Sequence, residues 1–186
     1  IRQNYFTKVI KQLQQLGCTR LLDFGCGPGD VLQRCEILGL SALGIDNSPR
    51  SVALAQQRGL SVLLGGADYS ALSQEKFDAI FIQSVIEHLQ DPCGQLKSLV
   101  DLLPPGGLLF ISAPTPCSDF WNDPTHVRPF TPRSFHIIGE LLNLEVIEVN
   151  FVFSYLLGLR LESAIWYKML NILPFALGSN LVGIYR

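Results

Sequence analysis

Closely spaced glycines beside acidic side chains give the first indication of chemistry in this sequence. The segment 21–30 begins as an apolar run and breaks into Gly25, Gly27 and Gly29 before a helix-like stretch. Glycine lets the backbone turn sharply and lets a ligand lie against bare main chain. A strand, a glycine-rich turn and a helix start, in that order, are typical of a nucleotide-binding corner. The sequence therefore predicts a nucleotide site at this turn.

The carboxylates around the turn narrow the kind of nucleotide. Asp23 and Asp30 flank the glycines, and Asp46 and Asp68 follow the next two predicted strands. A dinucleotide fingerprint requires G-x-G-x-x-G, and its third glycine would fall at Asp30. Pyrophosphate is attracted by backbone N–H groups and the positive end of a helix, whereas carboxylates repel it. The acidic rim favours a cationic ligand without phosphate, such as S-adenosylmethionine, and disfavours an NAD-dependent dehydrogenase.

Histidines are the candidates for proton transfer, because imidazole accepts protons near neutral pH. His126 stands in a loop rich in prolines and aromatics, after the fifth predicted strand. We interpret His126 as a base or an acceptor-positioning group, and its neighbours Trp121, Arg128 and Phe130 as substrate contacts. The alternative is that His126 and Arg128 only pin the loop over a bound cofactor.

Two other histidines are weaker candidates. His88 follows Glu87 just after the fourth predicted strand, close to the glycine turn, and is the second catalytic candidate. Its alternative role is local hydrogen bonding. His136 sits in the middle of a predicted helix beside Ile137 and Ile138, which favours a packed or surface role.

The elements that would position these residues alternate between strand and helix. The strands are apolar on both faces, which indicates a parallel sheet covered by helices on both sides. An open α/β sheet binds its ligand at the carboxyl edge, where the carboxylates and His126 are expected. Strands are predicted at 20–24, 41–45, 60–64, 77–83, 108–113, 144–152 and 179–185, and helices at 5–16, 31–38, 49–58, 92–103 and 133–142.

Composition limits the class of protein. The 186 residues are enough for one domain, residues 1–186, with a single core. With 14 Lys+Arg against 16 Asp+Glu, no basic surface for nucleic acid is expected. Five cysteines without close pairs argue against a disulfide framework and a zinc site, so no metal and a cytoplasmic location are predicted. Because the chain begins with Ile1, we expect the natural N-terminus to lie upstream; the sequence shows no signal peptide or membrane span.

Five motifs in order make the chain similar to the class I S-adenosylmethionine-dependent methyltransferases over nearly its full length. One glycine motif alone is a weak signal, whereas five with the right spacing are specific. The resemblance implies a Rossmann-like three-layer α/β/α sandwich with a seven-stranded, mostly parallel sheet and an antiparallel last strand. The matching segments are 23–29 (D-x-G-x-G-x-G), 44–48, Ala67-Asp68, 77–80 leading into 84–89, and 103–109.

The resemblance also implies which residues would bind S-adenosylmethionine. Gly25 and Gly27 would approach the methionine part, and Asp23 would help hold its ammonium. Asp46 lies about 20 residues beyond the first glycine, the spacing at which a carboxylate accepts ribose hydroxyls. Asp68 would accept a hydrogen bond from the adenine amine. The remaining cofactor-binding residues would be Phe24, Cys26, Gly29, Asn47, Ser48, Ala67, Tyr69, Gln83 and Ser84.

An unusually apolar stretch, 153–178, precedes the last predicted strand. We expect a helical insertion that covers the core; the alternatives are a lid over an apolar substrate, a homodimer face or a peripheral membrane contact. The sequence thus predicts methyl transfer to a small-molecule acceptor, at an oxygen of a hydrophobic or lipid-linked metabolite. The alternative is a catalytically inactive cofactor-binding module that acts as a partner subunit.

Overall fold

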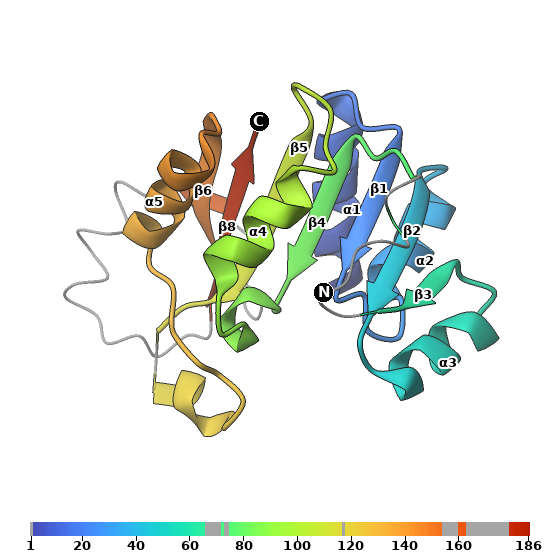
Figure 1. Ribbon diagram of the computed structural model, residues 1–186, viewed down its shortest axis with the longest axis horizontal. Helices are drawn as coiled ribbons and strands as arrows, with labels where there is room; N and C mark the ends of the chain where they lie inside the picture. Colours follow the sequence, from blue (N-terminus) through green and yellow to red (C-terminus); the bar gives the residue numbers. More distant parts are fainter. Residues whose placement is uncertain (1, 66–71, 73–74, 117, 154–159, 163–178) are drawn as a thin grey trace.

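The computed structural model describes residues 2–65, 72, 75–116, 118–153, 160–162 and 179–186 (Figure 1). Eight strands in these residues form one sheet in the order β3-β2-β1-β4-β5-β8-β6-β7. The strands are β1 (Arg20–Phe24), β2 (Ser41–Asp46), β3 (Val62–Leu64), β4 (Ala79–Gln83), β5 (Leu108–Pro114), β6 (Val146–Phe153), β7 (Arg160–Glu162) and β8 (Ser179–Tyr185).

Seven of these strands confirm the predicted sheet. β1 to β5 run parallel to one another, and β8 is antiparallel to both β5 and β6. The eighth, β7, is a short edge strand that pairs antiparallel with β6. It lies inside the stretch predicted to be helical, 153–178, so that prediction is wrong at 160–162, where the open edge of β6 supplies a backbone hydrogen-bonding partner. The prediction is also wrong at Phe153, which is the last residue of β6. Residues 154–159 and 163–178 of that stretch lie outside the described residues.

Helices cover the two faces of the sheet, as the three-layer prediction requires (Figure 1). Adjacent strand residues point to opposite faces: Leu21 packs with Ile10 of α1 and Cys35 of α2, whereas Leu22 packs in the core that includes Leu96 of α4 and Phe135 of α5. The helices are α1 (Arg2–Gln15), α2 (Asp30–Ile37), α3 (Pro49–Gln57), α4 (Pro92–Val100) and α5 (Pro132–Leu142), with 3₁₀ turns η2 (Ile86–His88) and η3 (Ser118–Asn122).

The ends of the elements differ from prediction by a few residues, for local reasons. The third strand begins at Val62 because the Leu60 N–H closes the end of α3 by donating to the Ala55 carbonyl, at 3.2 Å. α3 begins at Pro49 as predicted, with the Ser48 hydroxyl accepting a hydrogen bond from the Ser51 N–H. Within the described residues, no helix has the length and apolar character needed to cross a membrane.

Candidate active site

The glycine turn joins β1 to α2 and presses against the end of β2. Gly25, Gly27 and Gly29 all have positive φ angles, of 75°, 53° and 87°, which side-chain-bearing residues adopt only with strain. The Gly25 and Cys26 N–H groups donate to the Ile45 carbonyl, at 2.8 and 3.2 Å. A Cβ on Gly25 would also lie 2.4 Å from Cγ2 of Val85, in the segment after β4. The turn is therefore packed from two sides, and only glycine fits at position 25.

Asp46, at the end of β2, is oriented toward this turn. Its Oδ2 accepts a hydrogen bond from the Gly27 N–H and its Oδ1 from the Ser48 N–H, both at 2.8 Å. The carboxylate is thus fixed beside the glycines, and each oxygen keeps a further lone pair. A fixed carboxylate with free lone pairs fits the predicted acceptor of ribose hydroxyls.

Asp23 places a buried carboxyl beneath the turn. It is 2% exposed, and its Oδ2 accepts no hydrogen bond from any described residue. Burial, together with the nearby charges of Asp46 and Asp30, raises the pKa of Asp23 to about 8. A buried acceptor without a donor fits the ammonium of S-adenosylmethionine, which would supply both charge and hydrogen bonds.

Two more buried polar atoms lie on neighbouring strands. Gln83 Oε1 on β4 and Ser112 Oγ on β5 have no hydrogen-bond partner among the described residues, and the two residues face each other in register. Ser84, the next residue, has a positive φ of 52° and donates its N–H to the Ser112 carbonyl at 2.8 Å. Backbone strain of this kind concentrates at functional sites. Here it turns the chain from β4 toward η2.

Further predicted cofactor residues, and Asp30 of the acidic rim, divide into three groups. Phe24 and Cys26 are buried, and burial raises the pKa of the Cys26 thiol to about 12, so that thiol stays protonated. Asp30 forms an ion pair with Arg58 at 3.1 Å, which offsets part of the negative charge around the glycine turn. Ala67, Asp68 and Tyr69 lie outside the described residues, and their adenine contacts stay predictions.

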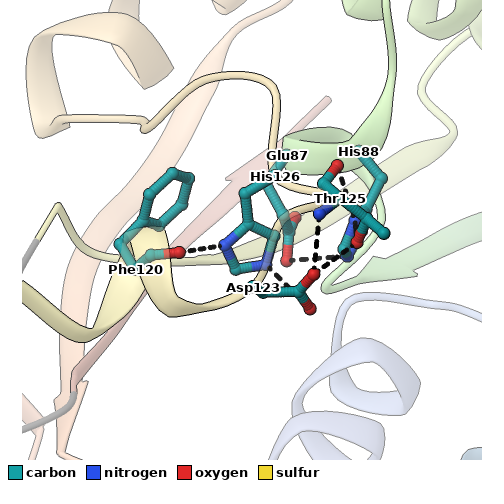
Figure 2. Close-up of polar contacts among 6 residues, drawn as sticks. All are labelled: Glu87, His88, Phe120, Asp123, Thr125 and His126. Atoms are coloured by element: carbon teal, nitrogen blue, oxygen red, sulfur yellow. Dashed lines mark hydrogen bonds and ion pairs between the residues drawn. The ribbon is translucent and has the colours of Figure 1, made fainter.

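The structure brings both candidate histidines together, at the carboxyl edge of the sheet (Figure 2). The Val127 N–H donates to the Glu87 carbonyl at 2.8 Å, and Arg128 Nη2 donates to the Gln90 carbonyl at 2.7 Å. These bonds tie the loop after η3 to the segment after β4. As a result the rings of His88 and His126 lie 4.8 Å apart, centroid to centroid.

Hydrogen bonds assign the tautomer of each ring. His126 Nδ1 lies 2.6 Å from the Phe120 carbonyl oxygen, which can only accept, so Nδ1 is the donor. His88 Nδ1 lies 3.3 Å from the Thr125 carbonyl oxygen and 2.9 Å from the Thr125 hydroxyl, which itself donates to Asp123 Oδ1 at 2.6 Å. In the neutral rings, both Nε2 atoms therefore carry a free lone pair.

Glu87 completes this group and is fully buried. Neither of its carboxylate oxygens accepts a hydrogen bond from the described residues, although Oε1 lies 4.0 Å from His88 Nε2. Burial, with a smaller contribution from Asp123, raises the pKa of Glu87 to about 7. The site thus collects two imidazole lone pairs and an unsatisfied carboxyl group.

The three predicted substrate residues have different surroundings. Trp121 is 59% exposed and stands edge-on to Phe120, with ring centroids 5.0 Å apart. Arg128 uses its guanidinium to hold the loop. Phe130 is 5% exposed and packs against Phe135 in the core. Contact of each with an acceptor stays a prediction.

Sequence reasoning did not select four residues that shape the site: Glu87, Phe120, Asp123 and Thr125. Glu87 was visible only as the neighbour of His88. The Asp123-Pro124-Thr125-His126 segment contains an aspartate and threonine that form a local turn, in which Asp123 Oδ1 accepts from the Thr125 N–H at 2.9 Å. That turn could be anticipated from sequence, but its contact with His88 could not.

The sheet order and an acidic glycine turn at the carboxyl edge define a Rossmann-like protein that binds a nucleoside without phosphate. Residues 2–149 match the family described as "Methyltransferase domain". The chain belongs to this methyltransferase family and has the Rossmann-like class I fold.

Similar proteins agree with the family. The ubiquinone biosynthesis O-methyltransferase of Cereibacter sphaeroides is 36% identical over 99 residues, which cover 50% of this chain and 40% of that relative. This chain therefore spans less than half the length of that protein. A SAM-dependent methyltransferase structure from Archaeoglobus fulgidus superimposes with a TM-score of 0.71 at 21% identity, covering 99% of this chain and 94% of that one. The plantazolicin methyltransferase BpumL, solved with SAH, gives a TM-score of 0.67 at 15% identity, with 100% and 84% coverage.

Proposed function

We propose that this chain transfers the methyl group of S-adenosylmethionine to an oxygen of a small hydrophobic or lipid-linked molecule. The observation that carries the proposal is the pair of Nε2 lone pairs on His88 and His126, at the sheet edge that also carries the glycine turn. A hydroxyl acceptor must lose a proton during transfer, and a neutral imidazole can take it.

The curated relatives support an oxygen acceptor. Those from Cereibacter sphaeroides and Ruegeria pomeroyi, at 36% and 37% identity, are named ubiquinone biosynthesis O-methyltransferases. The Phe120 ring contacts both Trp121 and His126, with ring centroids 5.0 and 4.3 Å apart. The exposed indole of Trp121 therefore offers an apolar surface for the acceptor close to His126. Both observations favour a hydrophobic hydroxyl compound over a nucleic acid or a polar amine.

The proposed mechanism is an in-line displacement at the sulfonium methyl. The acceptor oxygen forms a bond to the methyl carbon, the carbon–sulfur bond breaks, and its electron pair stays on sulfur. The proton of the hydroxyl passes to His126 Nε2, whose ring is held by the Phe120 carbonyl. Correct alignment of oxygen, carbon and sulfur can contribute roughly 7–11 kcal/mol to such a reaction.

The test is the turnover of a His126→Ala variant, with S-adenosylmethionine affinity measured alongside. We expect turnover of a hydroxyl acceptor, found by screening phenols and lipid-linked alcohols for methyl ether formation, to fall by about 10²–10⁴-fold. Cofactor affinity should stay within about twofold.

The matched control is His136→Ala, which removes an exposed histidine on α5 and should leave turnover unchanged. Unchanged turnover in His126→Ala would exclude a catalytic His126. Methylation of nitrogen or sulfur acceptors alone would overturn the oxygen assignment. Cofactor binding without turnover of any acceptor would favour the inactive module.

A further inference from the structure

We propose that Glu87, His88 and His126 together bind a divalent first-row transition-metal ion of the zinc type. The inference rests on the proposed function, because the same ion would bind the acceptor oxygen. It adds a metal where the sequence predicted none.

The first observation is the convergence of three metal-ligand side chains from two segments. One ligand atom from each of Glu87, His88 and His126 lies within 4.8 Å of the other two. Zn²⁺ binds imidazole nitrogen and carboxylate oxygen at about 2.0–2.2 Å. Ligands around a tetrahedral ion are then about 3.4 Å apart, so closing the site requires side-chain movements of roughly 1 Å.

The second observation is the orientation of the rings. A metal-binding histidine usually donates its other ring N–H to a carbonyl or carboxylate, which fixes the tautomer and the ring plane. His126 donates Nδ1–H to the Phe120 carbonyl, and His88 donates to Thr125 (Figure 2). The Thr125 hydroxyl is held in turn by Asp123. Both histidines therefore already have the supporting hydrogen bonds of metal ligands.

The third observation is the unsatisfied carboxylate. Glu87 is fully buried, and neither oxygen accepts a hydrogen bond from a described residue. Glu87 Oε1 lies 4.0 Å from His88 Nε2, and Asp123 Oδ2 lies 3.8 Å from His126 Nε2. In the neutral rings both nitrogens are acceptors too, so the cluster contains lone pairs without donors. A cation among the three groups would remove this electrostatic conflict, because buried charge requires a partner.

The ligand set indicates the class of ion. Two imidazoles with one carboxylate suit Zn²⁺, Fe²⁺ or Co²⁺, whereas Mg²⁺ prefers oxygen ligands alone. Three protein ligands leave a position open, as in catalytic zinc sites. An acceptor hydroxyl bound there would lose its proton to water more readily, because a bound cation lowers the pKa of a coordinated oxygen. In the metal-bound enzyme His126 is a ligand, so water replaces it as the proton acceptor. The acceptor oxygen still attacks the methyl carbon as sulfur leaves, which keeps the oxygen-methylation part of the proposed function.

The experiment measures metal binding in the absence of acceptor. Protein treated with EDTA and then dialysed is titrated with Co²⁺, followed by visible absorption, and with Zn²⁺, followed by calorimetry. We expect one equivalent to bind. Glu87→Gln, His88→Ala and His126→Ala should each weaken binding at least tenfold, and Thr125→Val, which removes a supporting hydroxyl, should weaken it about 10–100-fold. His136→Ala should bind as the wild type does.

The outcomes separate this inference from the proposed function. Absence of stoichiometric Co²⁺ and Zn²⁺ binding by wild-type protein would overturn the metal site, whatever the variants do. Equal affinity in wild type and His126→Ala would overturn it as well. Full methyl transfer in the presence of EDTA would overturn the role of the metal in catalysis, and the proposal of oxygen methylation would be unaffected. Stoichiometric binding without methylation of any hydroxyl acceptor would confirm the metal site and reject the proposed acceptor.

Discussion

At the scale of single residues, we propose that Asp23 links cofactor binding to protonation. Its carboxyl group is buried near Asp46 and Asp30, and the pKa of about 8 means that the protonated form dominates at neutral pH. The folded state then holds the proton more tightly than the unfolded chain does. The contribution of Asp23 to stability is therefore largest at low pH and declines as pH rises from about 4 to about 8. A cofactor ammonium placed against this carboxyl would favour its ionised form.

We predict that S-adenosylmethionine binding at pH 6 to 7 releases about one proton from the protein, because the ammonium displaces the proton of Asp23. Calorimetry in buffers of different ionisation enthalpy measures this release. Asp23→Asn should abolish it and weaken binding, whereas Asp101→Asn, which changes an exposed carboxylate, should not. Equal proton release in wild type and Asp23→Asn would show that Asp23 does not meet the ammonium.

At the scale of elements, the site depends on contact between the β1–α2 turn and the segment that links β4 to η2. Val85 in that segment packs against the bare Cα of Gly25. The Ile45 carbonyl holds the same turn from the other side. The glycine is needed both for its positive φ and for this packing, and the two costs can be separated by mutation.

We predict that Gly25→Ala destabilises the fold by about 2–5 kcal/mol, the sum of a positive-φ cost and an overpacking cost. Gly39→Ala is the matched control, because Gly39 has a φ of 69° but no atom within 4 Å of an added Cβ. It should cost only about 1–2 kcal/mol. Urea unfolding of Gly25→Ala, Val85→Ala and the double variant completes a mutant cycle. A coupling energy near zero would mean that Val85 does not constrain the turn.

At the scale of the whole molecule, β8 joins the two halves of the sheet. It lies between β5 and β6 and pairs antiparallel with both. Its last residue, Tyr185, is fully buried, and the hydroxyl donates to the Phe135 carbonyl of α5 at 3.0 Å. One side chain thus connects the sheet to α5, the helix that follows the loop containing His126.

We predict that Tyr185→Ala destabilises the protein by about 3–5 kcal/mol, because it leaves a large cavity in the core. Tyr185→Phe removes only the hydrogen bond and should cost about 1 kcal/mol. Ile37→Ala, at a position that is 63% exposed, should change stability by less than about 0.5 kcal/mol. Equal losses for the Phe and Ala variants, by urea unfolding, would contradict a packing role for the ring.

The sequence by itself determined the alternation of strands and helices, the glycine turn and the position of Asp46. These features follow from local rules: apolar periodicity, helix caps such as Ser48, and the carboxyl-edge placement of residues that end parallel strands. The last strand, β8, was predicted with its observed bounds. Its antiparallel direction came from the family resemblance rather than from periodicity.

Only the tertiary structure determined which residues lie beside His88 and His126, and which secondary structure residues 160–162 of the apolar stretch adopt. Glu87 and His126 are distant in sequence, and they meet because the loop after η3 bonds to the segment after β4. Apolar composition favoured a helix at 160–162, but a strand forms there because the edge of β6 offers hydrogen bonds. In both cases the deciding partner lies elsewhere in the chain, where no local pattern records it.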